Sequence, residues 1–284
     1  MSSRALVAVL VAAAGCGRAS TPVSPSPPVV TVSQPPAPAT GLNSFMRDYI
    51  EALFLGTGVL TPTDGVRGCP RSFGTWQGFP AGTAVQVVVS SSVPVASANA
   101  LATAVTTVSS ASAGSLSATI SQTTDANPMP SINQVSATLH SNPQSLGCGF
   151  PQGCTIFNFV PGTAFTQSAR SILVTGQTPA AFVHDAVGHG VMGLCHVDGN
   201  LIGGPGLSLM SYGPGIFSNQ LPTQLSAYDL VATRAVFSSG LTVGATREDF
   251  LRMGLVNATD ASTAAVPNVR VMNRSSQVGA TAIR

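Results

Sequence analysis

The chain has 284 residues, of which only 8% are charged, and its formal net charge is +2. This length suits one medium-sized domain with short appendages. A nucleic-acid surface needs clustered basic side chains, which this composition does not supply, so we expect no nucleic-acid partner.

The first 16 residues are typical of a bacterial export signal. Arg4 supplies a positive charge, residues 5–14 form an apolar run, and Gly15–Cys16 closes the segment. The run is too short to span a bilayer permanently. Residues 13–16 resemble a bacterial lipobox, which implies that Cys16 is lipidated and anchors the protein to a membrane. A plain secretory signal is the alternative, and in both cases we expect an extracytoplasmic protein.

Residues 17–41 carry seven prolines among Ser, Thr, Val and Ala. Such a composition cannot bury a core and predicts an extended linker. The linker would hold a folded domain, expected over residues 42–256, away from the membrane. Residues 257–284 are polar and aperiodic, which predicts a flexible C-terminal tail. We expect the protein to be a monomer.

Residues 43–55 are predicted to form a helix, because apolar side chains recur at three- and four-residue spacing and Gly56 can end it. Downstream, β-branched and alternating apolar runs predict strands, and an amphipathic segment predicts a second helix. The strands are expected at 84–90, 115–121, 154–160 and 170–175, and the helix at 95–110. This order predicts an α/β (α+β) fold. The Ser-, Asn- and Pro-rich segment 122–151 allows no definite prediction, although part of it can be strand.

Four cysteines remain besides Cys16, and an even number in an exported protein favours disulfides. Cys148 and Cys154 bracket a short Gly- and Pro-rich segment, which suits a local pair. Cys69 and Cys195 would then pair by elimination. The sequence permits three pairings, so the connectivity stays open at this point.

Three of the four histidines fall within thirteen residues: His184, His189 and His196. Neutral imidazoles are the commonest protein ligands of zinc, and a catalytic zinc needs three protein ligands and one open position. Thr178–Pro179 supplies a good N-cap and first helical residue, and it predicts a helix that carries the first two histidines and ends near Gly193. The sequence therefore predicts a zinc site with these three ligands.

Asp185 follows the first of these histidines directly. A carboxylate in this place can take a proton from water whose pKa zinc has lowered to about 7, so we expect Asp185 to be a general base. The stretch 184–196 also resembles the metzincin zinc-peptidase motif HExxHxxGxxH. It has one extra residue in each gap and Asp185 where the motif has Glu.

Two later segments carry the same resemblance. Ser208–Gly213 (SLMSYG) resembles the metzincin Met-turn, which implies that Met210 forms a hydrophobic base under the metal and that Tyr212 stabilises the oxyanion. Residues 225–237 resemble the helix that closes matrixin and serralysin catalytic domains, and Ser226 and Asp229 match a capping box at its start. The resemblance implies a twisted mixed sheet with an active-site helix, a Met-turn and a C-terminal helix. It also implies Zn²⁺ as cofactor and a protein or peptide as substrate.

The spacing between the first two histidines requires an irregular helix. Residues five apart on a regular α-helix are rotated by about 140° from each other. A π-bulge absorbs one extra residue and returns both rings to one face, so we predict a bulge between His184 and His189. The ligating nitrogens should then lie about 3–3.5 Å apart, as zinc–nitrogen bonds near 2.1 Å require.

Some alternatives remain open in the sequence. Keeping strict metzincin spacing from His189 would select Asp185, His189 and Cys195 as ligands, and Asp198 is a spare candidate. A catalytically inactive lipoprotein that binds metal or protein would carry the same motifs as an enzyme. An exported structural or adhesive protein is a third reading. The sequence does not indicate the substrate or any calcium site.

Overall fold

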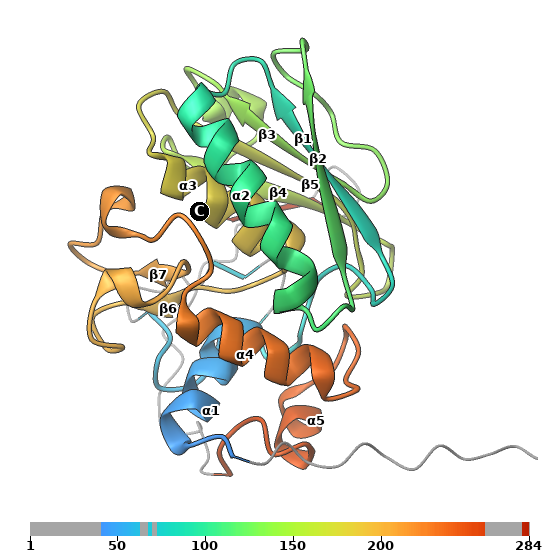
Figure 1. Ribbon diagram of the computed structural model, residues 1–284, viewed down its shortest axis with the longest axis vertical. Coiled ribbons are helices and arrows are strands. Elements are labelled where there is room, and N and C mark those ends of the chain that lie inside the picture. Colours follow the sequence, from blue (N-terminus) through green and yellow to red (C-terminus); the bar gives the residue numbers. More distant parts are fainter. Residues whose placement is uncertain (1–40, 63–67, 70–72, 259–279, 284) are drawn as a thin grey trace, which may run out of the picture. The chain divides into compact units, whose positions relative to one another are not determined.

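The computed structural model describes residues 41–62, 68–69, 73–258 and 280–283. The predicted signal with Cys16, nearly all of the linker and most of the tail lie outside these ranges. The described residues form a mixed sheet with helices packed on it, together with a second group of helices and loops from both ends of the described chain (Figure 1). The expected α/β (α+β) class is confirmed.

The main sheet has six strands in the order β2-β1-β3-β5-β4-β8. Its strands are β1 Ala84–Ser90, β2 Ser117–Thr123, β3 Gln134–Leu139, β4 Gly153–Phe159, β5 Thr166–Leu173 and β8 Ala280–Ile283. β1, β2, β3 and β5 run parallel, whereas β4 is antiparallel to both of its neighbours. β8 falls in the range for which the sequence predicts a flexible tail.

Strand β3 occupies part of the segment for which the sequence allows no definite prediction. Val135 and Ala137 face the apolar core, while Ser136 and Thr138 on the opposite face are also fully buried. Central parallel strands usually have apolar residues on both faces, and this strand is apolar on only one. Because polar and apolar residues alternate, the sequence does not indicate that both faces of this strand are buried.

One face of the sheet is covered by helix α2 (Val95–Ala111) and by helix α3 (Pro179–Val183), which continues as the π-helical segment η3 (His184–Val191). The apolar stripe of α2 is buried, as the periodicity predicts. η3 packs against β3, β4 and β5. The segment that carries two of the three clustered histidines is thus fixed to the centre of the sheet.

A second group of elements lies below the sheet in Figure 1. It contains α1 Ser44–Ile50, η1 Glu51–Leu55, β6 Val197–Asp198, β7 Ser211–Tyr212, α4 Ala227–Ser238 and α5 Arg247–Arg252. Short 3₁₀ segments are η2 Pro143–Leu146, η4 Pro205–Leu207 and η5 Ser218–Gln220. In this second group, the ring of Trp76 packs edge to face on Phe54 of η1, with centroids 5.7 Å apart, and on Phe237 of α4, with centroids 5.1 Å apart. The predicted capping box of α4 is confirmed, whereas the short helix α5 was not predicted.

Both expected disulfides are present: Cys69 pairs with Cys195, and Cys148 pairs with Cys154. The first joins residues 126 positions apart, and the second closes a local loop beside β4. Among the described residues, the helices are all too short or too polar to cross a bilayer.

Candidate metal centre

The helix that carries His184 and His189 begins as the sequence predicts. The side chain of Thr178 caps it by accepting a hydrogen bond from the backbone N–H of Ala181, and Pro179 occupies its first position. The backbone becomes π-helical from His184 to Val191. The predicted bulge between the two histidines is therefore confirmed, and it extends over the whole segment.

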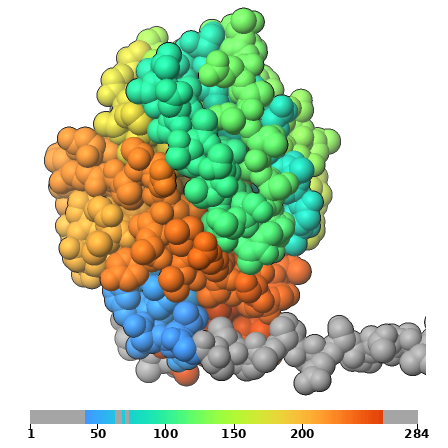
Figure 2. Space-filling view, viewed as in Figure 1, coloured from blue at the N-terminus to red at the C-terminus, as the bar shows by residue number. Residues whose placement is uncertain are grey.

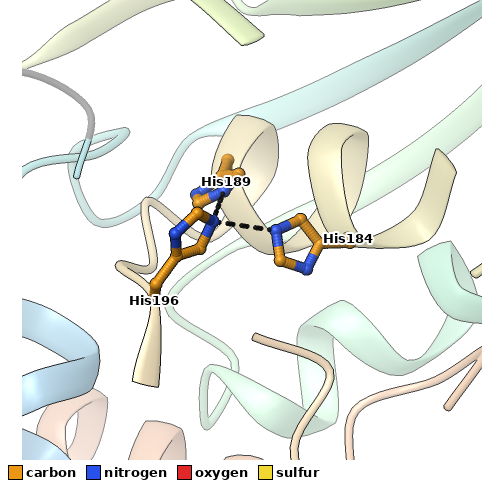
Figure 3. Close-up of side chains that lie close together, drawn as sticks. All are labelled: His184, His189 and His196. Carbon is orange, nitrogen blue, oxygen red and sulfur yellow. Dashed lines mark hydrogen bonds between the residues drawn. The ribbon is translucent and has the colours of Figure 1, made fainter. Parts of the chain in front are cut away.

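The three imidazoles converge on a common point (Figure 3). The Nε2 atom of His196 lies 3.1 Å from Nε2 of His184 and 3.0 Å from Nε2 of His189. All three side chains are buried, and their ligand atoms lie within 4.8 Å of one another. The two separations from His196 match the spacing expected between nitrogen ligands of one zinc ion.

Backbone carbonyls fix the orientation of two of the rings. His184 donates its Nδ1–H to the carbonyl oxygen of Leu209 at 2.8 Å, and His189 donates its Nδ1–H to that of Leu194 at 2.7 Å. A neutral imidazole that donates from Nδ1 carries a lone pair on Nε2. Both lone pairs are therefore directed toward the shared point, which is the arrangement that metal-ligating histidines adopt.

The donor set itself fits a cation. Nε2 of His184 and Nε2 of His189 are both acceptors, and both lie within hydrogen-bonding distance of Nε2 of His196. A proton on His196 can point at only one of them, so neutral rings cannot satisfy all three nitrogens. A metal ion between the rings can satisfy them, and three buried histidines with convergent nitrogens are a donor set that zinc commonly takes.

Burial keeps the rings in the state that binds metal. Burial lowers the pKa of His184 to about 4, and the hydrogen bond to Leu209 offsets part of that effect. The pKa of His189 is well below its usual value because of burial first, and then because of repulsion from His184 and His196. Both imidazoles are consequently neutral at pH 7 in the metal-free protein, with their lone pairs available.

His196 reaches the site from a loop and not from the helix. The ring of Tyr212 stacks on it, with centroids 4.6 Å apart and planes 6° from parallel. The backbone of Gly68 lies so close to the ring that a Cβ atom there would be 2.4 Å from Nδ1 of His196. Cys195, the preceding residue, is bonded to Cys69. The third histidine is thus held from two separate parts of the chain, the segment Gly68–Cys69 and Tyr212.

Met210 lies beneath the π-helical segment, as the Met-turn resemblance implies. A Cβ atom on Gly188 would be only 2.3 Å from the sulfur of Met210. The methionine sulfur therefore contacts the bare backbone between His184 and His189. A larger residue at position 188 would require the Met210 side chain or the backbone to shift.

Asp185 is buried beside the trio, and burial raises its pKa to about 7. Within the described residues, no group donates a hydrogen bond to its carboxylate. Its backbone carbonyl accepts a hydrogen bond from Thr155 on strand β4 at 3.0 Å, which fixes this turn to the sheet. A carboxyl group with a pKa near 7 is suited to proton transfer at neutral pH.

A cleft of about 510 Å³ opens beside these groups. His184, Asp185, His196 and Tyr212 contribute to its lining, so four of the predicted site residues share one accessible cavity. Its other walls are largely apolar and come from Leu173, Ala181, Ile216, Phe217 and Leu221. The loop after Met210 supplies three of these apolar side chains.

The alternative ligand sets are not assembled. Cys195 is in a disulfide, which removes the set of Asp185, His189 and Cys195. In the part of the chain that the structure describes, Asp198 is not among the residues whose ligand atoms converge. Its carboxylate instead accepts a hydrogen bond from the backbone of Asn200 at 2.9 Å.

The sequence interpretation missed the groups that orient the ligands. The carbonyls of Leu194 and Leu209 are backbone atoms, and no residue pattern signals them. Gly68 is one glycine in a Gly-rich loop and also carries no distinguishing signal. The sequence indicates Asp229 only as part of a capping box, although its contacts extend to Ser208 and Leu209.

Comparison with known proteins adds no further assignment: no family model matches the chain, and no curated protein or solved structure matches it either. The functional interpretation therefore depends on the geometry described above and on the motif resemblance.

Proposed function

We propose that this chain is an extracytoplasmic zinc-dependent endopeptidase of the metzincin type, acting on a protein or peptide substrate. The observation that carries the proposal is the convergence of three buried imidazole nitrogens, 3.0–3.1 Å apart along two sides, next to an open cleft. The methionine under the helix and the closing helix α4 are further features that the metzincin resemblance implies.

His184, His189 and His196 would hold the ion. When bound, zinc supplies Lewis acidity, which polarises a peptide carbonyl and lowers the pKa of water to about 7. Asp185 would accept the proton of the water that adds to the carbonyl carbon. It would then return that proton to the amine nitrogen as the carbon–nitrogen bond breaks. The hydroxyl group of Tyr212 would donate a hydrogen bond to the developing oxyanion.

Two disulfides support an oxidising compartment, because such bonds persist in exported proteins. The N-terminal segment with Cys16 would place the protein at a membrane through a lipid anchor. The proline-rich linker would let the domain reach extracytoplasmic substrates while the anchor stays in the bilayer.

A direct test uses the purified domain, zinc and an unfolded protein substrate. We expect one zinc per chain, cleavage of the substrate, and loss of cleavage after treatment with a chelator. Asp185→Asn should retain zinc and lose cleavage by a factor of about 10²–10⁴, the range for removal of a general base. Asp198→Asn is the matched control, since this nearby buried acid lies outside the trio. Absence of zinc binding by the wild-type protein would refute the proposal.

One observation favours a second candidate, a catalytically inactive metal- or protein-binding lipoprotein. Asp185 is one methylene shorter than the glutamate of the metzincin motif, which reduces its reach toward a water molecule. In that case zinc binds at one ion per chain without cleavage. Asp185→Glu would then produce cleavage that the wild-type protein lacks, provided that reach alone is the deficit.

A further inference from the structure

Asp229, in the first turn of α4, has a fully buried carboxylate with four hydrogen-bond donors. Its Oδ1 accepts from the hydroxyl of Tyr49 at 2.6 Å and from that of Ser208 at 2.8 Å. Its Oδ2 accepts from the backbone N–H groups of Leu209 and Ser226, both at 2.8 Å. One side chain thus connects α1, α4 and the Met-turn.

A continuous hydrogen-bond chain leads from this carboxylate to a metal ligand. The hydroxyl of Ser208 donates to Asp229 and accepts from the backbone N–H of Met210 at 2.9 Å. The same peptide group carries the carbonyl of Leu209, which accepts the Nδ1–H of His184 at 2.8 Å. Each donor in this chain points in the same direction, toward the carboxylate.

The capping function explains only one of these four contacts. Capping requires one oxygen to accept from the N-cap backbone, and Oδ2 does this at Ser226. Asp249 performs the same task for α5, where its Oδ2 accepts from the backbone of Thr246 at 2.8 Å and the side chain remains partly exposed. Oδ1 of Asp229 has no capping role, and both of its donors belong to other elements.

Aligned hydrogen bonds polarise one another, and the effect is larger in a buried, low-dielectric region. A carboxylate at the end of such a chain strengthens the acceptor that orients a metal-bound imidazole and raises the basicity of the ring. The usual form of this arrangement is a carboxylate bonded directly to histidine. Here a serine hydroxyl and one peptide group lie between the two.

We propose that Asp229 is a positioning residue for the ligand His184, acting through Ser208 and the Leu209–Met210 peptide group. Tyr49 attaches helix α1 to the same carboxylate, so the N-terminal helix supports the site as well (Figure 2 shows the blue α1 region against the orange α4 region). The part of this proposal that concerns zinc affinity rests on the proposed function.

Three variants test the hydrogen-bond chain between Asp229 and His184. For each variant, zinc affinity is measured, and the ¹H–¹⁵N signals of the His184 ring are recorded in metal-free protein. Asp229→Asn can keep its amide oxygen toward the two backbone donors, which preserves the cap. Its NH₂ group then faces the two hydroxyls and reverses the direction of the Ser208 bond. Ser208→Ala removes the link and leaves the cap intact. Tyr49→Phe removes only the contact to α1, and Asp249→Asn is the matched capping control.

We expect zinc affinity to fall about 10- to 100-fold for Asp229→Asn and about tenfold for Ser208→Ala, the range for outer partners of metal ligands. Tyr49→Phe should have a smaller effect, and Asp249→Asn none. In metal-free protein, the Nδ1–H proton of His184 should move upfield in the first two variants, which a purely structural cap would not produce.

Unchanged ring signals and wild-type zinc affinity in folded Asp229→Asn and Ser208→Ala would overturn the proposal. If Asp229→Asn does not fold, Ser208→Ala decides the question, because it retains the cap. If the wild-type protein binds no zinc, the proposed function fails, but the ring signals of the metal-free variants still test the hydrogen-bond chain.

Discussion

The two halves of the candidate metal centre are built in different ways. His184 and His189 belong to one π-helical segment that packs on the centre of the sheet, and backbone carbonyls orient both rings. His196 comes from a loop, where Tyr212, Gly68 and the Cys69–Cys195 disulfide hold it. Local structure thus supplies the first two ligands, whereas contacts distant in sequence supply the third.

Loss of a ligand from the helical half should have the largest effect. His189→Ala removes one of the three ligating nitrogens. Loss of a residue that only hydrogen-bonds to a ligand lowers metal affinity about 10- to 100-fold, so the fall in zinc affinity for His189→Ala should be larger. Zinc should then raise the melting temperature of the wild-type protein but not of the variant, because only binding to the folded state stabilises it. His140→Ala, which replaces the remaining and part-exposed histidine, is the control and should behave as wild type. Equal zinc affinity of both variants would contradict the assignment of His189.

The loop half should depend on one disulfide and not on the other. Cys69→Ser with Cys195→Ser opens the long loop and should destabilise the protein by about 4–5 kcal/mol on the chain-entropy scale. It should also weaken zinc binding, since Cys195 adjoins His196. Cys148→Ser with Cys154→Ser opens a six-residue separation, with a cost of about 2 kcal/mol and no change in zinc affinity. Denaturant unfolding and zinc titration of both double variants test the comparison.

The contact between Gly188 and Met210 tests the packing of the helical half. Gly188→Ala would place a Cβ atom 2.3 Å from the methionine sulfur, so the buried Met210 side chain or the backbone around it must move. Overpacking of this kind costs about 1–3 kcal/mol, which should appear in both unfolding and zinc affinity. Gly149→Ala is the matched control, because a Cβ atom there meets nothing within 4 Å. Similar behaviour of the two variants would show that Met210 does not support the site.

The smallest effect is expected from the ring that stacks on His196. Tyr212→Leu removes the stacking, which is worth about 0.5–1.5 kcal/mol, so zinc affinity should fall by at most about tenfold. Tyr212→Phe keeps the ring and should keep the affinity, while losing the proposed oxyanion donor and with it activity. A fall in affinity for Tyr212→Phe would mean that the hydroxyl, and not the ring, holds His196.

The sequence predicted the helical half more completely than the loop half. The five-residue spacing of His184 and His189 was enough to predict a π-bulge, because helix geometry is a local property. The pairing of Cys69 with Cys195 could be inferred only by elimination. The close approach of Gly68 to His196 depends on tertiary packing between segments far apart in the chain, and no periodicity records it.

The same distinction applies to the fold. Strand β1 and helix α2 were predicted nearly to the residue, since apolar side chains mark their buried faces. Strand β3 was not located, because the buried Ser136 and Thr138 interrupt its apolar pattern. Burial of a polar face depends on what later covers it, which a single sequence does not indicate.

The bond between Cys69 and Cys195 has a consequence for when the three-histidine site is fully assembled. During synthesis under reducing conditions this cross-link does not form, so the third imidazole lacks one of its restraints. Formation of the cross-link in an oxidising compartment would restore that restraint and complete the arrangement of the three rings. If the proposed function holds, the protein would reach its full zinc affinity only after this cross-link has formed.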